Sequence, residues 1–286
     1  MTQAETSEVV AGALYVVATP IGNLGDLSPR AQRVLAQVEL VAAEDTRTSG
    51  ALLEHFGIRA KFFALHDHNE DGAASALLAR LKAGASVALV SDAGTPLISD
   101  PGYALVRQAR AAGVPVFAVP GPSALIAALS VAGLPTDRFS FRGFLPPKRE
   151  ARRQALEALA REPATVVLYE SSHRIAETLD DIAAVLGAAR PLFVARELTK
   201  KFEDSHAGSA ESARAWLAAD ANRSRGEFVL VLGGAPETQA SDADSERLLR
   251  LLLEELPPAR AAKLAAAWSG RPKPALYELA MALKKT

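Results

Sequence analysis

Short apolar segments alternate with helix-like segments through the first 120 residues of the chain. β-branched or apolar runs occupy residues 14–18, 38–43, 61–65, 87–90 and 114–119. Helical patterns separate them at 28–37, 49–57, 73–84 and 104–113. Continuously apolar strands that alternate with helices are typical of a parallel sheet with helices on both faces. The pattern therefore predicts an N-terminal α/β domain over residues 13–121.

A second series of strand-like runs predicts a second α/β domain over residues 122–235. Its apolar runs lie at 138–144, 165–170, 191–197 and 226–234. The boundary between the two domains is expected in the segment VPGPSALIAALSVAGLP, which joins the two series. The polar, turn-rich segment PETQASDADSE follows the second series and predicts a linker over residues 236–245.

Three short helical patterns make up the rest of the chain, residues 246–286. Pro257 and Pro258 separate the first two patterns, and the segment GRPKP separates the last two. The last two patterns fit a helix-turn-helix-like pair; the alternative is a small helical cap with solvated lysines. This extension holds eight Lys/Arg and four Glu, a balance of +4, so the preceding residues carry −5 of the chain's net charge of −1. A basic extension favours an anionic partner.

Composition narrows the kinds of site that the chain can hold. The absence of cysteine excludes disulfides, thiolate metal sites and a cysteine nucleophile. The chain has no run of about 18 apolar residues, and its first residues, MTQAETSEVV, lack the basic start and apolar centre of a signal peptide. We therefore expect a globular protein of the cytoplasm.

Glycine- and proline-rich loops follow the expected strands of the first domain. They read TPIGNLGD, EDTRTSG, SDAGTPLISDPG and PGPSA. Ligands of parallel α/β sheets gather at the carboxyl ends of the strands, where such residues let the backbone approach a ligand closely. The loops favour a nucleoside-like cofactor. They contain neither a Walker A motif nor the GxGxxG dinucleotide motif, which argues against nucleotide hydrolysis and hydride transfer.

Nine motifs in order carry a resemblance to a known family: TPIGNLGD, AAEDTR, ALHDHNE, SDAGTPLISDPG, PGPSA, GFLPPK, YESSHRI, ARELTK and GEFVLV. Together they resemble the ribosomal RNA small-subunit methyltransferase I family of the tetrapyrrole methylase superfamily, over residues 13–234. The resemblance implies two α/β domains with S-adenosylmethionine in the cleft between them, usually in a homodimer. It implies 2′-O-methylation of the ribose of a decoding-centre cytidine in 16S rRNA, within the small ribosomal subunit.

The resemblance also implies a set of cofactor contacts, which fall on Pro20, Ala93, Gly94, Thr95, Ile98, Ser123, Ala124 and Glu170. Thr95-Pro96 stands where precorrin-modifying relatives have Asp-Pro. A hydroxyl therefore takes the place of a carboxylate at that contact.

Asp100 is the residue that we expect to act on the acceptor. Methyl transfer from a sulfonium to oxygen is an in-line displacement that depends on positioning and needs no metal. A ribose hydroxyl that keeps its proton is a poor nucleophile, so a nearby carboxylate or histidine helps. Asp100 would orient or deprotonate the 2′-hydroxyl; the alternative is that it caps the helix that starts near Gly102.

Two further segments have competing interpretations. His66-Asp67-His68 has ligands of the kind that zinc or iron binds, but without a distant fourth ligand we favour a loop that lines an RNA cleft ahead of a helix capped by Asn69. Arg47, at the start of a helix, is poorly placed for the helix dipole. It is therefore expected to contact a phosphate or the substrate rather than to serve the helix.

RNA binding requires cations, and they gather near the strand ends of the second domain. With Arg47 and His66, the expected substrate contacts are Lys148, Arg152, Arg153, Arg174 and Arg196. Two alternatives remain open for the function. One is a related methylase that acts on a tetrapyrrole or a protein, and the other is a non-catalytic RNA-binding assembly factor.

Overall fold

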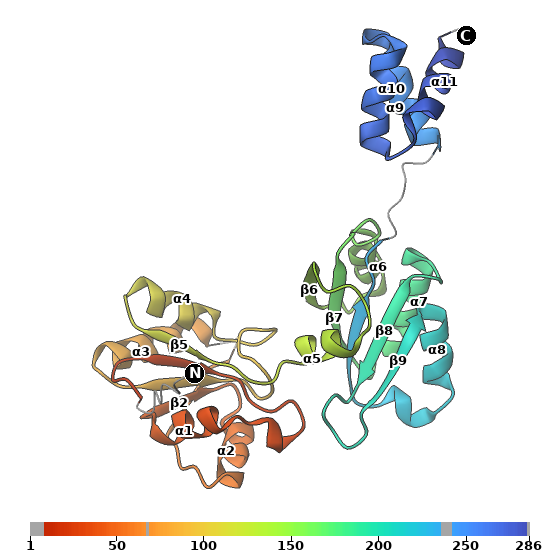
Figure 1. Cartoon of the computed structure of the whole chain (residues 1–286). Helices are drawn as coiled ribbons and strands as arrows, with labels where there is room; N and C mark the ends of the chain where they lie inside the picture. Colours follow the sequence, from red (N-terminus) through yellow and green to blue (C-terminus); the bar gives the residue numbers. More distant parts are fainter. Residues whose placement is uncertain (1–8, 67–68, 236–241, 285–286) are drawn as a thin grey trace, which may run out of the picture. The chain divides into compact units, whose positions relative to one another are not determined.

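The computed structural model describes residues 9–66, 69–235 and 242–284. The chain divides into two compact units, Met1–Gly234 and Ala235–Thr286 (Figure 1). In the part of the chain that the structure describes, the first unit contains two five-stranded sheets with their helices, and the second contains three helices. Within the described residues, no helix is long and apolar enough to cross a membrane.

The first sheet is entirely parallel, with the strand order β3-β2-β4-β1-β5. Its strands are β1 (Leu14–Val17), β2 (Leu40–Ala43), β3 (Phe62–Ala64), β4 (Val87–Val90) and β5 (Val116–Val119). Every residue of β2 and β4 is buried, as expected for central strands covered on both faces. From the adjacent strands β1 and β4 the chain leaves toward opposite edges of the sheet. This is a topological switch point, where open α/β sheets bind ligands.

Helices cover both faces of the first sheet. α1 (Pro29–Gln37) and α2 (Thr46–His55) pack on one face, and α3 (Glu70–Lys82) and α4 (Tyr103–Ala111) pack on the other. α1 begins where the sequence favours a helix start, because the Ser28 hydroxyl accepts a hydrogen bond from the Ala31 N–H and proline occupies the first helical position. A short 3₁₀ turn, η1 (Leu24–Asp26), precedes it.

The second sheet has the order β6-β7-β10-β8-β9 and is mixed. Its strands are β6 (Phe139–Phe144), β7 (Thr165–Ser171), β8 (Pro191–Arg196), β9 (Asp204–Ser209) and β10 (Glu227–Leu232). Only β6 and β7 run parallel, and the other pairs are antiparallel. β9 has no counterpart in the sequence prediction because its residues, DSHAGS, are polar. As a partly exposed edge strand it needs no apolar face.

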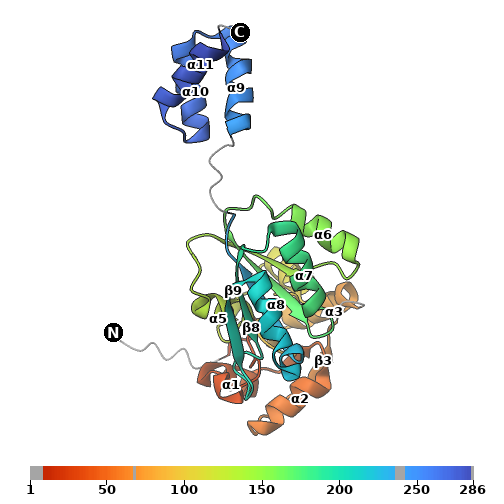
Figure 2. The same ribbon diagram turned by 90° about the vertical axis from the view of Figure 1, so that its right-hand side faces the viewer.

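The helices of the second sheet are divided unequally between its faces. α5 (Ala124–Val131) packs on one face. α6 (Arg149–Glu157), α7 (Ile175–Leu186) and α8 (Ala210–Ala218) cover the other, and the short turn η2 (Ala221–Ser224) follows α8. Figure 2 shows α6, α7 and α8 together on one side of the strands. The expected fold class, two α/β domains with a helical extension, is confirmed.

The second unit is a three-helix bundle made of α9 (Asp242–Glu255), α10 (Pro258–Ser269) and α11 (Lys273–Leu283). Its core is small and alanine-rich, with Leu249, Ala261, Ala265, Leu276 and Ala280 fully buried. Gly270 ends α10 in the left-handed conformation at φ 71°, which glycine adopts at low cost. Residues 242–245, expected as linker, form the first turn of α9.

Candidate active site

A cavity of ≈ 420 Å³ lies in the first unit, and both α/β domains contribute to its wall. From the first domain come loops that follow β1, β2 and β4. From the second come the start of α5, the ends of β6 and β7, the loop after β8 and the start of β10. This size is within the range of small-molecule sites, and the position at the strand ends is the one expected for an α/β sheet.

The loop after β4 bends sharply to form one wall of the cavity. Gly94 and Gly102 have φ values of 86° and 124°, and the non-glycine residues Leu97 and Ser99 have φ values of 73° and 68°. A left-handed non-glycine residue costs about 1–3 kcal/mol and tends to persist at functional sites. The glycines and prolines of SDAGTPLISDPG therefore allow the backbone to follow this strained, sharply bent path.

Hydrogen bonds join the loop after β4 to three neighbouring loops. Thr19 and Gly94 exchange backbone hydrogen bonds at 2.9 and 3.1 Å. The Thr95 hydroxyl donates to the Pro122 carbonyl at 2.9 Å, and the Asp45 N–H donates to Asp92 Oδ1 at 3.0 Å. The loops after β1, β2, β4 and β5 thus form one connected rim.

The cavity wall is rich in carboxylates. The described residues that line it include Glu44, Asp92, Asp100, Glu170 and Glu227, against a single lysine and no arginine or histidine. Such a lining favours a ligand that carries positive charge.

Lys200 is that lysine, and its charge is fixed by two carboxylates. Its ammonium lies 2.9 Å from Glu197 Oε1 and 2.8 Å from Glu227 Oε2. Burial acts to lower the pKa of Lys200, but the hydrogen bonds to Glu227 and Glu197 outweigh it and raise that pKa. Lys200 is therefore a cation at neutral pH and cannot accept a proton.

Lys200 also joins the two α/β domains. A Cβ atom added at Gly22, in the loop after β1, would overlap the aliphatic stem of Lys200. The stem consequently packs directly on the Gly22 backbone beside the cavity.

Tyr169 and Asp100 lie near each other in the wall. The Tyr169 ring packs edge-on against Phe141 and Phe144, with centroids 4.8 and 5.7 Å away. Burial raises the pKa of the Tyr169 phenol, and the charge of Asp100 raises it further. Tyr169 therefore stays protonated and does not act as a base.

The helix start near Gly102, which Asp100 could have capped, is capped by Glu70. Its Oε1 accepts hydrogen bonds from the N–H groups of Gly102 and Ala104, both at 2.9 Å, at the start of α4. Asp100 itself lines the cavity.

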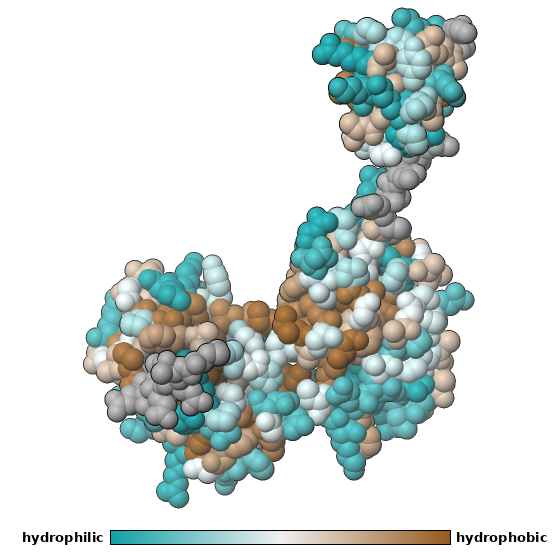
Figure 3. Space-filling model, viewed as in Figure 1, coloured by the Kyte–Doolittle hydropathy of each residue, from teal (hydrophilic) through white to brown (hydrophobic). Residues whose placement is uncertain are grey.

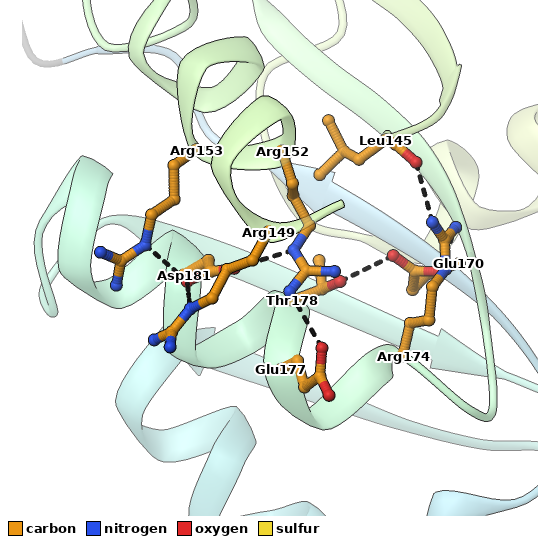
Figure 4. A network of polar contacts seen from close by, with 9 residues as sticks. All are labelled: Leu145, Arg149, Arg152, Arg153, Glu170, Arg174, Glu177, Thr178 and Asp181. Atoms are coloured by element: carbon orange, nitrogen blue, oxygen red, sulfur yellow. Dashed lines mark hydrogen bonds and ion pairs between the residues drawn. The ribbon is translucent and has the colours of Figure 1, made fainter. Parts of the chain in front are cut away.

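Most of the expected cofactor contacts come together in this cavity. Its lining includes Ala93, Gly94, Thr95, Ile98, Ser123, Ala124 and Glu170. Pro20 does not line the cavity. It is buried, and the next residue, Ile21, lines the cavity in its place. The Glu170 carboxylate is itself engaged, because it accepts hydrogen bonds from Thr178 Oγ1 and pairs with Arg174, each at 2.7 Å (Figure 4).

The expected substrate contacts are more scattered. Arg47 has a 90% exposed side chain that pairs with Asp45 at 2.7 Å. Hydrogen bonds from Arg47 lower the pKa of Asp45 to about 2. Lys148 is exposed directly before α6. The His66 N–H donates to the Asn69 side chain, and His66 is not in the cavity lining; Asp67 and His68 lie outside the described residues.

Three of the expected RNA-binding arginines instead bond inside the protein. Arg152 is fully buried, and its guanidinium pairs with Asp181 at 2.8 Å and Glu177 at 3.1 Å. Arg196 is 8% exposed and donates to the carbonyls of two loop residues. Arg174 donates to the Leu145 carbonyl and pairs with Glu170. The burial of Arg152 and Arg196 contradicts a contact with RNA, because internal acceptors already hold their guanidinium groups.

Sequence reasoning missed several lining residues, notably Phe144 and Tyr169. Tyr169 had a local signal, because it directly precedes Glu170 at the end of an expected strand. Lys200 lies in the motif ARELTK, but only the fold brings it to Gly22 and Glu227.

Comparison with known proteins agrees with this architecture. The family model described as Tetrapyrrole (Corrin/Porphyrin) Methylases matches residues 13–214, and the model described as RsmI C-terminal HTH domain matches residues 239–284. A solved structure of uroporphyrin-III C-methyl transferase from Thermus thermophilus, complexed with S-adenyl homocysteine, superposes with a TM-score of 0.51 at 21% identity. It covers 78% of this chain and 98% of that chain, and the likeness shows a shared fold.

Two relatives match at much higher identity. The chain is 57% identical over 267 residues to the ribosomal RNA small subunit methyltransferase I of Xylella fastidiosa strain Temecula1, covering 93% of this chain and 98% of that protein. It is 53% identical over 283 residues to the protein of the same name from Escherichia coli O157:H7, covering 98% and 99%. The chain therefore belongs to the ribosomal RNA small subunit methyltransferase I family, within the tetrapyrrole methylases.

Proposed function

We propose that the protein transfers a methyl group from S-adenosylmethionine to ribosomal RNA. The acceptor is the ribose 2′-hydroxyl of a decoding-centre cytidine in the 16S rRNA of the small subunit. The observation that carries the proposal is the cavity at the switch point of the first sheet, closed on its other side by the second domain, in a chain of this family.

The cavity has the chemistry that S-adenosylmethionine requires. The cofactor carries a sulfonium and an ammonium, which suit the carboxylate-rich wall. Gly94 and Thr95 of the turn line the cavity, while Ile98, Leu198 and Val229 provide apolar contact. When bound, the cofactor supplies the methyl group as an electrophile. The related uroporphyrin-III C-methyl transferase was solved with S-adenyl homocysteine.

The residues of the chain then act on the ribose. Asp100 orients the 2′-hydroxyl and accepts its proton as oxygen attacks. Lys200 is held as a cation by two carboxylates, so it does not compete for that proton. Tyr169 and Phe144 form an aromatic wall that restricts the position of the nucleotide.

The proposal is tested with unmodified small ribosomal subunits, purified protein and methyl-labelled S-adenosylmethionine, followed by nuclease digestion and nucleoside mass spectrometry. Label is expected in 2′-O-methylcytidine, and subunits that already carry the modification serve as the control. Cofactor binding without label in RNA would point to a tetrapyrrole or protein acceptor. Failure to bind the cofactor at all would favour a non-catalytic assembly factor.

We also propose that the protein works as a homodimer. Large apolar side chains are exposed on α5 and on the sheet edges β5 and β6: Phe117 38%, Ile126 53%, Val131 59% and Phe139 43%. Figure 3 shows apolar surface gathered around α5 and β6. Exposed apolar patches with unpaired strand edges are typical of subunit interfaces. Light scattering of the purified protein is expected to give twice the mass of the chain, and a monomer would contradict the proposal.

A further inference from the structure

Three arginines of α6 converge on one buried carboxylate of α7. Asp181 has no exposed side-chain surface, and it accepts hydrogen bonds from Arg153 at 2.7 Å, Arg152 at 2.8 Å and Arg149 at 3.2 Å (Figure 4). Burial acts to raise the pKa of Asp181, but the bonds from the three arginines outweigh it and lower that pKa. Asp181 is therefore a fixed anion.

The three arginines do not have the same role. Arg152 is buried, and its guanidinium pairs with Asp181 and Glu177, so it joins α6 to α7. The side chains of Arg149 and Arg153 are 67% and 40% exposed, and each contacts Asp181 through Nε. Figure 4 shows the terminal nitrogens of both pointing away from Asp181.

A guanidinium that is held through its Nε atom is already oriented to bind an anion with its terminal nitrogens. Its terminal nitrogens form a planar fork that matches two oxygens of a phosphate, and its orientation is already fixed. Fixing the side chain before binding reduces the entropy lost on binding. The cluster has three guanidinium groups against the carboxylates of Asp181 and Glu177, which leaves a positive excess beside the exposed Lys148.

The arginine cluster is attached to the cavity wall. Phe144 lines the cavity and precedes Arg149 by five residues, so the two backbones are at most about 18 Å apart. The intervening loop is fastened at Leu145, whose carbonyl accepts from Arg174 at 2.9 Å. Arg174 in turn pairs with Glu170 in the cavity wall at 2.7 Å.

We propose that Arg149 and Arg153, oriented by Asp181, form a clamp for backbone phosphates of the RNA strand whose ribose enters the cavity. This inference rests on the proposed function. Asp181 is the positioning residue of the clamp, and the arginine forks contact the phosphates.

Matched variants separate fork geometry from charge. The double variant Arg149→Lys/Arg153→Lys keeps both charges but loses the forks, and Arg149→Gln/Arg153→Gln loses both. Arg161→Gln, an exposed arginine beyond the end of α6, is the control. The readouts are KM for small subunits at several salt concentrations, kcat, the Kd for S-adenosylmethionine and the thermal midpoint of unfolding.

The Lys double variant is expected to raise KM by about 10-fold with little change in the salt slope, because the charge is kept. The Gln double variant is expected to raise KM further and to reduce the salt slope by about 1.5–2. Both should bind S-adenosylmethionine as the wild type does, which verifies that they fold. A Lys double variant with wild-type KM would overturn the clamp, as would a Gln double variant with an unchanged salt slope. Failure of the proposed function would look different, because the wild type itself would place no methyl group in RNA.

Discussion

Replacing Asp100 by Asn is expected to lower the rate of methyl transfer by about 10²- to 10⁴-fold, even when S-adenosylmethionine saturates the protein. Asn has almost the same shape as Asp and keeps one acceptor oxygen, but it takes no proton at neutral pH. The change therefore removes proton acceptance beside the cavity and leaves the strained loop around Ser99 in place. The measurement is the single-turnover rate with cofactor and small subunits both saturating.

Asp137→Asn provides the comparison, because this aspartate is exposed, lies outside the cavity lining and has the same chemistry. Its rate should match the wild type. A wild-type rate for the Asp100 variant would show that another group accepts the proton. Weakened cofactor binding with little change in rate would instead place Asp100 against the cofactor.

Replacing Asp181 by Ala is expected to lower the free energy of unfolding by about 3–5 kcal/mol, the cost of leaving a buried charge without its buried partner. That charge is the guanidinium of Arg152, whose side chain has no exposed surface and which then pairs only with Glu177, a residue with a 69% exposed side chain. The neighbouring variant Asp180→Ala is a matched control, because Asp180 pairs with Arg214 at the surface, where both side chains are about half exposed. An exposed pair contributes about 0–1 kcal/mol. Urea unfolding at pH 7 measures the free energy of unfolding of both variants. Equal losses in the two variants would contradict the assignment of Asp181 as a buried anion that stabilises the fold.

The contribution of Asp181 also depends on pH, with a defined sign. The pKa of Asp181 is lower in the folded protein than that of an ordinary aspartate, because the three arginines bond to its anion, so folding favours the anion. The stabilisation is complete above the unfolded pKa and is lost as pH falls below about 4 toward the folded pKa. The difference in unfolding free energy between wild type and Asp181→Ala should therefore be constant near neutrality and shrink in acid. A difference that grows in acid would contradict this assignment.

The strands of the first domain could be predicted from the sequence because they are buried on both faces. Val87–Val90, for example, has the same bounds in the apolar pattern and in the structure. Strand direction in the second sheet could not be predicted, because a buried strand is equally apolar beside a parallel or an antiparallel neighbour. β9 escaped detection because its residues are polar.

Part of the cavity could also be predicted from the sequence. Its turn residues lie in continuous motifs, so the segment from Ala93 to Asp100 could be identified directly. Arg152 could not be placed, because an arginine beside other charged residues is typical of a solvated helix face. Asp181, the buried carboxylate with which Arg152 pairs, comes 29 residues later in the chain. Only the packing of α6 on α7 brings the two together.

The order of strands in the second sheet has a consequence for how the protein is made. β10 lies between β7 and β8, yet it is the last strand of the first unit to be synthesised. Until it emerges, β6–β7 and β8–β9 remain two separate pairs with exposed inner edges. The cavity is incomplete for the same period, because Glu227, Phe228 and Val229 of β10 belong to its wall. A nascent chain that has folded its first sheet early, as N-terminal domains generally do, must therefore wait for its final strand before it can enclose a cofactor.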